Sequence, residues 1–454
     1  MRKEQKSFFH FGIVKTVKEF LRRLIKCWKV GIKRKYMRYR IKVKDIVEVL
    51  KCNAICATLF FTTLNTFVFS MLSLIGINAE YSTEVVALFS YGILFLMGLY
   101  SVFYLKPYML IIPLFMLIMY FSSFIFFTQN RPFLLGNEIL LGFLGLGLPA
   151  FLSSVTLDNI DKLEKYLHKY CITVVFIQTF LSIASHLSMP WCDRSNYMEI
   201  SYQLLVPIIY FLLLEKGTVI DKFCLIAGII IVIIDGARGP LVGIILCIGY
   251  RIISRFSKEK IALSMFLGML GIIILIANYQ TIFTWILNTA NHFGFKGNLI
   301  RHIEWGDVFS PSGRDELFSL AVTVINKFMF TGSGMAGDRY WLNALGYGKT
   351  GAYTHNIFGE LLIDYGIILG TILILFLCIM IYLCFIKRES MYLKIFKILF
   401  FSLGFSRLLL SSSYIIEVGF YVMMAMMIRG IKFRYIGEKN EEHINNYTLV
   451  LSDK

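Results

Sequence analysis

The chain has 454 residues, of which 57% are hydrophobic and only 17% are charged. Soluble globular proteins carry about 25% charged residues, and here the apolar residues gather in stretches long enough to cross a bilayer. This composition excludes a disordered chain and argues against a set of soluble domains. The net charge of +17 is local, because residues 1–51 hold 17 of the 46 lysines and arginines and only four acidic residues, which gives that segment +13.

The basic arm, residues 1–51, interleaves apolar and basic side chains between Phe8 and Lys29. This pattern favours an amphipathic helix lying on anionic lipid. A disordered arm and a nucleic-acid-binding arm are the alternatives. The basic region is too long for a cleavable signal peptide, so the first apolar stretch is expected to act as an uncleaved anchor.

The apolar stretches predict an all-α integral membrane protein with about 12 transmembrane helices. Nine of them fall within residues 52–279, a large outer loop covers 280–356, three more lie within 357–428, and 429–454 form a cytoplasmic tail. The individual spans are expected at 54–76, 85–104, 108–128, 133–156, 168–188, 198–214, 220–236, 238–255, 261–279, 357–386, 391–411 and 413–428.

Lysine and arginine in the short loops predict the orientation. Alternate loops are rich in both, whereas the intervening short loops carry at most one basic residue each, namely Arg131, Arg194 and Arg238. Both termini are therefore expected in the cytoplasm. The long loop 280–356 lies on the outer side, and 313–329 within it has the spacing of an amphipathic helix. A flexible glycine-rich turn is expected to follow at 331–337.

The outer face collects arginines, including Arg301, Arg314 and Arg339 as well as Arg238. Because arginine can bind phosphate through two parallel hydrogen bonds, the set suggests an anionic ligand such as a lipid diphosphate. The alternative is that each arginine pairs with a nearby aspartate. The nine cysteines form no disulfide framework or zinc-site spacing, and no metal site is expected.

Three further residues carry chemistry at the start of the span 357–386. His355 can exchange a proton near neutral pH, or it can simply cap the helix together with Asn356. Glu360 and Asp364 are four residues apart and therefore share a helix face, with Arg407 as the expected partner. Charges inside a membrane mark either a function or a buried ion pair.

These motifs occur in a recognisable order. Asp-Gly-Ala-Arg238-Gly-Pro lies between two spans, and Ser312-Gly-Arg314-Asp-Glu-Leu-Phe lies in the long loop. Gly332-Ser-Gly334 and His355-Asn356 follow, with Gly366 eleven residues after the histidine. This order resembles the O-antigen polymerase / O-antigen ligase superfamily over residues 225–371. Ala237, where the family often has serine, and Phe330-Thr331, where it usually has proline, depart from the pattern.

The resemblance implies transfer of a glycan from polyprenyl diphosphate at the outer face of the bacterial inner membrane, without metal or cofactor. It suggests His355, Arg314, Arg238 and Glu360 as catalytic residues, and Arg238, Arg301, Arg314 and Arg339 as diphosphate ligands. The expected partners are the lipid-linked glycan, membrane lipids, and chain-length regulator and flippase proteins, with no nucleic acid. A polymerase making O-antigen or capsule is the first interpretation, a ligase acting on lipid A–core the second, and a flippase of lipid-linked sugars the third.

Overall fold

The structure is a computed structural model, and it describes residues 35–77, 82–186, 189, 197–235, 238–255, 278–293, 303, 314–347, 351–387 and 390–431. All regular elements among these residues are helical. The chain divides into a short unit, Met1–Val49, and a main unit, Leu50–Lys454. The amphipathic helix expected between Phe8 and Lys29 and most of the span expected at 261–279 lie outside the described residues.

The first labelled helix is α2 (Lys35–Leu59). The labelled helices that follow are α3 (Phe61–Leu74), α4 (Ser82–Ala87), α5 (Ile93–Ser101), α6 (Ile111–Phe126), α7 (Arg131–Leu134), α8 (Asn137–Ile139), α9 (Leu148–Val155), α10 (Ile160–His186), α11 (Tyr197–Leu213), α12 (Val219–Asp235), α13 (Arg238–Arg255), α15 (Tyr279–Phe293), α17 (Arg314–Lys327), α18 (Gly337–Ala344), α19 (Ile357–Ile386), α20 (Met391–Phe401) and α21 (Ser406–Leu410). A last helix covers Val418–Ile431. The π-helical segments Leu88–Gly92 and Leu140–Gly147 join α4 to α5 and α8 to α9.

Four helical stretches among the described residues are long and apolar enough to cross a membrane, or up to six if each of two bent pairs is one span. The four are Thr83–Tyr104, Asn137–Val155, Ile160–Ser185 and Ile357–Ile386. Ile200–Leu213, Gly239–Ser254 and Val418–Ile431 are shorter apolar helices. The chain is therefore a helical membrane protein, while the count of twelve spans and the outer placement of 280–356 remain predictions.

Three of the expected spans are not straight helices. The chain bends by 77° between α2 and α3, and by 106° between α6 and the short helical turns that follow it. The span expected at 391–411 is divided into α20 and α21. Gly404 lies in the gap between them and close to Gly419, where an added Cβ would be 3.0 Å from the Gly419 carbonyl oxygen. Hydropathy measures apolar content and does not register such bends.

The exposed side of α19 supports its assignment as a span. Large apolar side chains recur there at intervals of three or four residues: Ile368, Ile372, Leu375, Ile379, Tyr382 and Ile386. An apolar stripe this long on the outside of a protein is suited to lipid and not to water.

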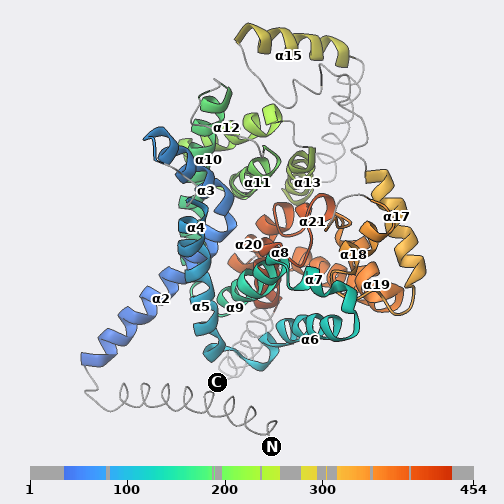
Figure 1. Ribbon diagram of the computed structural model, residues 1–454. Helices are drawn as coiled ribbons and strands as arrows, with labels where there is room; N and C mark the ends of the chain where they lie inside the picture. The colour runs from blue at the N-terminus through green and yellow to red at the C-terminus, as the bar shows by residue number, and fades with distance from the viewer. Residues whose placement is uncertain are drawn as a thin grey trace, which may run out of the picture. The chain divides into compact units, whose positions relative to one another are not determined.

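Helix α11 lies at the centre of the main unit. Residues 200–212 are buried almost without interruption, and α11 packs against α10, α12 and α13 (Figure 1). Gly228 allows the close approach of α12, because a Cβ there would lie 2.9 Å from the Ile208 side chain. Small residues serve this purpose between membrane helices, where lipid gives little hydrophobic driving force.

The helix expected at 313–329 is present as α17, and it packs with α18 and α19 (Figure 1). Its buried face contains Leu317, Ala321 and Val324. Phe318 and Val322 on the same helix are exposed. Among the described residues, the buried face of α17 is the one that packs with α18 and α19.

Candidate functional site

The site is built around a break in α19. Gly366 has φ 74° and ψ 173°, a combination that is essentially restricted to glycine. The break divides α19 into a half-helix, 357–365, and a long second part, 367–386. This half-helix carries Glu360 and Asp364, so the position of the break sets the position of both carboxylates.

The loop between α17 and α18 docks on this break. The amide N–H groups of Ser333 and Gly334 donate to the carbonyl oxygens of Ile363 (2.8 Å) and Asp364 (3.0 Å), and Ile367 N–H donates to Met329 O (2.7 Å). Backbone groups released by the break thus find partners in the loop. Buried backbone N–H and C=O groups need such partners, because an unpaired one costs free energy comparable to a lost hydrogen bond.

Two glycines make the docking sterically possible. A Cβ on Gly332 would lie against the Asp364 carbonyl oxygen, 2.6 Å from Tyr365 C and 2.7 Å from Gly366 N. A Cβ on Gly366 would lie 2.9 Å from Gly332 N. The prediction of a flexible turn at 331–337 is therefore wrong: the segment is buried and hydrogen-bonded, and its glycines permit backbone-to-backbone contact.

The bent end of α6 holds the same loop from its other side. Asn130 Nδ2 donates to the carbonyl oxygens of Ser333 (2.8 Å) and Met335 (3.2 Å), and Met335 N–H donates to Ser123 Oγ at 2.7 Å. Arg131, one of the arginines expected to face an anion, instead donates from Nε to Phe124 O at 2.8 Å. Its role in the structure is to close the bend.

A cluster of buried charges lies where α18 meets the half-helix. Arg339 Nη1 is 3.1 Å from Asp338 Oδ1 and 3.5 Å from Glu360 Oε1. Arg339 is 1% exposed, Asp338 and Glu360 are 0% exposed, and Asp364 is 2% exposed. Although burial opposes the charged form, the carboxylates of Asp338 and Glu360 raise the pKa of Arg339 above its ordinary value, so the guanidinium stays charged.

Both carboxylates of the half-helix also bind the segment 411–414. Glu360 accepts hydrogen bonds from Ser413 Oγ and from Tyr414 N–H (3.1 Å), and Asp364 accepts from the Tyr414 hydroxyl at 2.9 Å. The prediction that Glu360 and Asp364 share a face is confirmed. The expected partner was wrong, because Arg407 pairs with Glu417 (3.4 Å) while Arg339 takes Glu360.

His355 lies at the mouth of the half-helix in a left-handed backbone conformation, φ 52°. Its Nδ1 is 3.3 Å from the Ser411 carbonyl oxygen, and its ring is 4.1 Å from the ring of Tyr353, centroid to centroid. Asn356 caps the helix by accepting from the N–H groups of Phe358 (2.9 Å) and Gly359 (3.2 Å). The capping role therefore belongs to Asn356.

The Ser411 carbonyl fixes the protonation of the His355 ring. A carbonyl oxygen can only accept, so in this bond Nδ1 carries the proton, and the neutral ring has its lone pair on Nε2. A non-glycine residue with φ above zero costs on the order of 1 kcal/mol. This arrangement holds a proton acceptor in one orientation.

The structure brings together some of the predicted site residues. Glu360 and Arg339 are in contact, and the Ser411–Tyr414 segment links Glu360 to His355. Arg314 opens α17 and Arg238 opens α13, but their side chains, like the whole of Arg301, lie outside the described part of the structure. Gly239 lies against the Tyr202 hydroxyl, and the Arg407 guanidinium lies 5.2 Å from the Tyr202 ring centroid, which places the start of α13 near Arg407.

Sequence reasoning missed Asp338, Tyr353 and the Ser413–Tyr414 pair. The adjacent opposite charges of Asp338 and Arg339, directly after the glycine run, are a signal that could have been used. Nothing local marks Ser413 or Tyr414. Among the described residues, no group of three or more histidines, cysteines, aspartates or glutamates has the arrangement to hold a metal ion.

Comparison with known proteins gives one match. Residues 223–375, about a third of the chain, match the model of a family described as O-antigen ligase. No curated protein and no solved structure matches the chain. The matched region begins before Arg238 and ends after Gly366, so it contains the buried charge cluster, His355 and the broken half-helix. The match supports the O-antigen ligase/polymerase superfamily for this chain.

Proposed function

We propose that the protein is a membrane glycosyltransferase that polymerises polyprenyl-diphosphate-linked oligosaccharide repeat units into O-antigen or capsular polysaccharide. The observation that carries this proposal is the family match over 223–375 together with the oriented His355 at the mouth of the broken half-helix. The reaction takes place at the outer face of the bacterial inner membrane, with both chain termini in the cytoplasm. Chain-length regulator and flippase proteins are its proposed partners.

In the proposed reaction, an acceptor sugar hydroxyl attacks the anomeric carbon of the donor glycan. A new C–O bond forms as the bond between that carbon and the diphosphate oxygen breaks, and the polyprenyl diphosphate leaves with the electron pair. His355 Nε2 takes the hydroxyl proton. A positioned base of this kind contributes typically about 10²–10⁴-fold to the rate.

The departing diphosphate develops negative charge, and fixed cations aimed at it stabilise the transition state. We assign this role to Arg238 and Arg314, which open helices α13 and α17, with Arg301 as a further ligand. The ends of both helices also contribute, because free N–H groups at a helix N-terminus favour anions. The apolar helices would hold the polyprenyl chain.

Arg339 and Glu360 have a positioning role in this proposal, not direct contact with substrate. Arg339 is 1% exposed and meets carboxylates, and both oxygens of Glu360 accept hydrogen bonds from Arg339, Ser413 or Tyr414. A diphosphate has no path to such groups. Their contacts instead hold the Ser411–Tyr414 segment, whose Ser411 carbonyl orients His355.

A ligase is the second candidate, and the description of the matching family as O-antigen ligase favours it. The two reactions share a donor and differ in the acceptor, which is a lipid-linked repeat unit for the polymerase and lipid A–core for the ligase. The matched segment contains the His355-Asn356 and Gly366 elements that both types carry, so it supports the shared chemistry.

The deciding experiment is a gel profile of surface polysaccharide from a strain lacking the gene, with lipid-linked glycans extracted in parallel. Single repeat units on the surface anchor, with the long ladder lost, support the polymerase. Loss of all surface attachment while long chains accumulate on the polyprenyl carrier supports the ligase. An unchanged profile would overturn both, and loss of externally exposed lipid-linked units would favour a flippase.

The phosphate-binding assignment is tested separately in membranes that contain the Arg238→Ala or Arg314→Ala variant. Removal of one fixed donor to a developing anion typically costs about 10²–10³ in rate. Arg131→Ala is the matched control, because that arginine closes a bend in α6. Full activity in both test variants would refute the assignment.

A further inference from the structure

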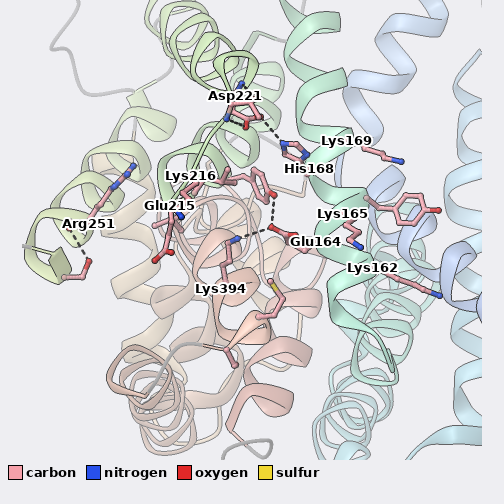
Figure 2. A pocket seen from close by; sticks show the side chains of 18 of the residues that line it. Lys162, Glu164, Lys165, His168, Lys169, Glu215, Lys216, Asp221, Arg251 and Lys394 are labelled. Atoms are coloured by element: carbon pink, nitrogen blue, oxygen red, sulfur yellow. Dashed lines mark hydrogen bonds and ion pairs between the residues drawn. The ribbon is translucent and has the colours of Figure 1, made fainter.

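A large cavity lies away from the buried charge cluster and His355. It has a volume of about 1150 Å³ and is open at the protein surface. Its walls come from the beginning of α10, the ends of α11 and α13, the beginning of α12 and the beginning of α20 (Figure 2). It does not include any of the residues proposed above for glycosyl transfer.

This cavity and the proposed active site lie at opposite ends of the same helices. Arg238 opens α13, and Arg251 near the other end of α13 lines the cavity. Thirteen residues of helix separate them by about 20 Å at about 1.5 Å per residue. Tyr202 and Tyr210 mark the same two ends on α11. The loops at the cavity end are those whose lysines and arginines predict the cytoplasmic side.

The cavity lining is strongly basic. Six lysine or arginine side chains and three carboxylates line it. Lys162, Lys165 and Lys169 recur at intervals of three and four residues on α10 and therefore share one face (Figure 2). Lys216 comes from the turn between α11 and α12.

The carboxylates of Glu164 and Asp221 have partners within the cavity wall. Glu164 Oε1 is 3.0 Å from Lys394 Nζ and accepts a hydrogen bond from the Tyr210 hydroxyl at 2.9 Å. Asp221 Oδ1 is 2.9 Å from His168 Nε2, and its Oδ2 accepts from Thr218 N–H at 2.7 Å (Figure 2). Within the described residues, Lys165 and Lys216 have no carboxylate partner, so their charges face the cavity opening uncompensated.

A helix end adds positive partial charge to the cavity. Helix α20 begins at Met391, and Ser390, Met391 and Lys394 line the cavity. The N-terminus of an α-helix carries partial positive charge and free N–H groups, which favour a bound anion. Ser390 Oγ accepts from Leu393 N–H at 3.4 Å.

We propose that this cavity binds a phosphate group, supplied either by an anionic phospholipid headgroup or by a soluble phosphate compound. The cavity is large enough for a headgroup and opens where basic loops meet the expected membrane surface. Juxtamembrane lysines and arginines attract anionic lipids, and basic pockets between membrane helices bind their headgroups. Phosphate bound there would tie α10, α12 and α20 together, on the side opposite the transfer reaction.

The test uses the full-length protein, purified in neutral detergent, delipidated, and titrated with a fluorescent phosphatidylglycerol; phosphatidylcholine is the zwitterionic reference. The test variant is Lys165→Gln/Lys216→Gln. The control is Lys106→Gln/Lys387→Gln, which makes the same charge change at lysines outside the cavity. Lys165 and Lys216 are exposed, so the test variant is expected to elute from size exclusion like the unmodified protein.

We expect phosphatidylglycerol binding to weaken about 30-fold in the cavity variant, as for loss of two lysines at an anionic surface, and to stay unchanged in the control. Displacement by inorganic phosphate would identify soluble phosphate compounds as a source, whereas lipid binding that inorganic phosphate does not displace would identify the headgroup. Equal weakening in both variants, or none in either, would overturn the proposal.

Discussion

The contact between Gly332 and Gly366 makes a quantitative prediction. Gly332→Ala places a methyl group against the Asp364 carbonyl oxygen and 2.6 Å from Tyr365 C, where only backbone atoms are present to yield. The residue also has φ 67°, which an L-residue with a side chain adopts at a cost. Gly351→Ala is the matched control, because Gly351 has φ 78° but nothing lies within 4 Å of an added Cβ.

The two costs can be separated. The left-handed conformation costs about 1–2 kcal/mol for a residue with a Cβ, and it applies to both variants. Overpacking against a fixed neighbour adds about 1–3 kcal/mol, and it applies only to Gly332→Ala. The steric part alone should therefore make Gly332→Ala less stable than Gly351→Ala by about 1–3 kcal/mol.

The measurement is the apparent melting temperature of each purified variant in the same detergent, scanned at one rate because membrane proteins often unfold irreversibly. Gly332→Ala should melt several degrees below Gly351→Ala and should also lose glycan transfer, since the half-helix that carries Glu360 must shift. Equal melting temperatures, or a lower one for Gly351→Ala, would refute the argument that the loop and the break are in backbone contact.

Three further predictions concern the side chains that the break positions. Arg339→Met removes the cation from two buried carboxylates and should destabilise the protein by about 3–5 kcal/mol, measured as a large fall in melting temperature; an unchanged melting temperature would contradict the ion pairs. His355→Asn keeps a residue that tolerates positive φ, so it should lower transfer activity by about 10²–10⁴-fold while the melting temperature stays near that of the unmodified protein; full activity would exclude His355 as the base. Burial raises the pKa of Tyr353 from 10 to about 12, so its hydroxyl stays neutral in the folded state while it ionises in the unfolded state. This stability contribution is present below pH 10 and is lost as the pH rises toward 12, and the fall in melting temperature over that range should be shallower in Tyr353→Phe.

Much of the helical arrangement follows from hydropathy. The spans expected at 238–255 and 357–386 have the bounds of α13 and α19, and the helix expected at 313–329 is α17. The apolar patterns predict where these segments begin and end, but they do not predict the break at Gly366 inside α19. The bends after α2 and α6 and the gap between α20 and α21 could not be predicted in the same way, because a bent span and a straight one have the same apolar content.

Partner choice was the least predictable feature. Arg407 and Arg339 are both arginines on the predicted outer side, and nothing in their local sequence indicates that Arg339 takes Glu360 while Arg407 takes Glu417. The choice depends on how far the loop after α17 reaches over α19. The position of this loop is set by the backbone contact between Gly332 and Gly366. In the sequence, the only sign of that contact is the two glycines.

The glycines and the charges in the recognised motif order therefore belong to one arrangement. Gly366 breaks α19, and the freed carbonyls of Ile363 and Asp364 accept N–H groups from Ser333 and Gly334. Because these hydrogen bonds hold the loop against α19, α18 begins at Gly337 beside the half-helix, and Arg339 reaches Glu360. Glu360 in turn binds Ser413 and Tyr414, and Ser411 in the same segment orients His355. A side chain at Gly332 would displace the Asp364–Gly366 backbone and so disturb every later contact in this series, although it would not itself meet His355 or Arg339.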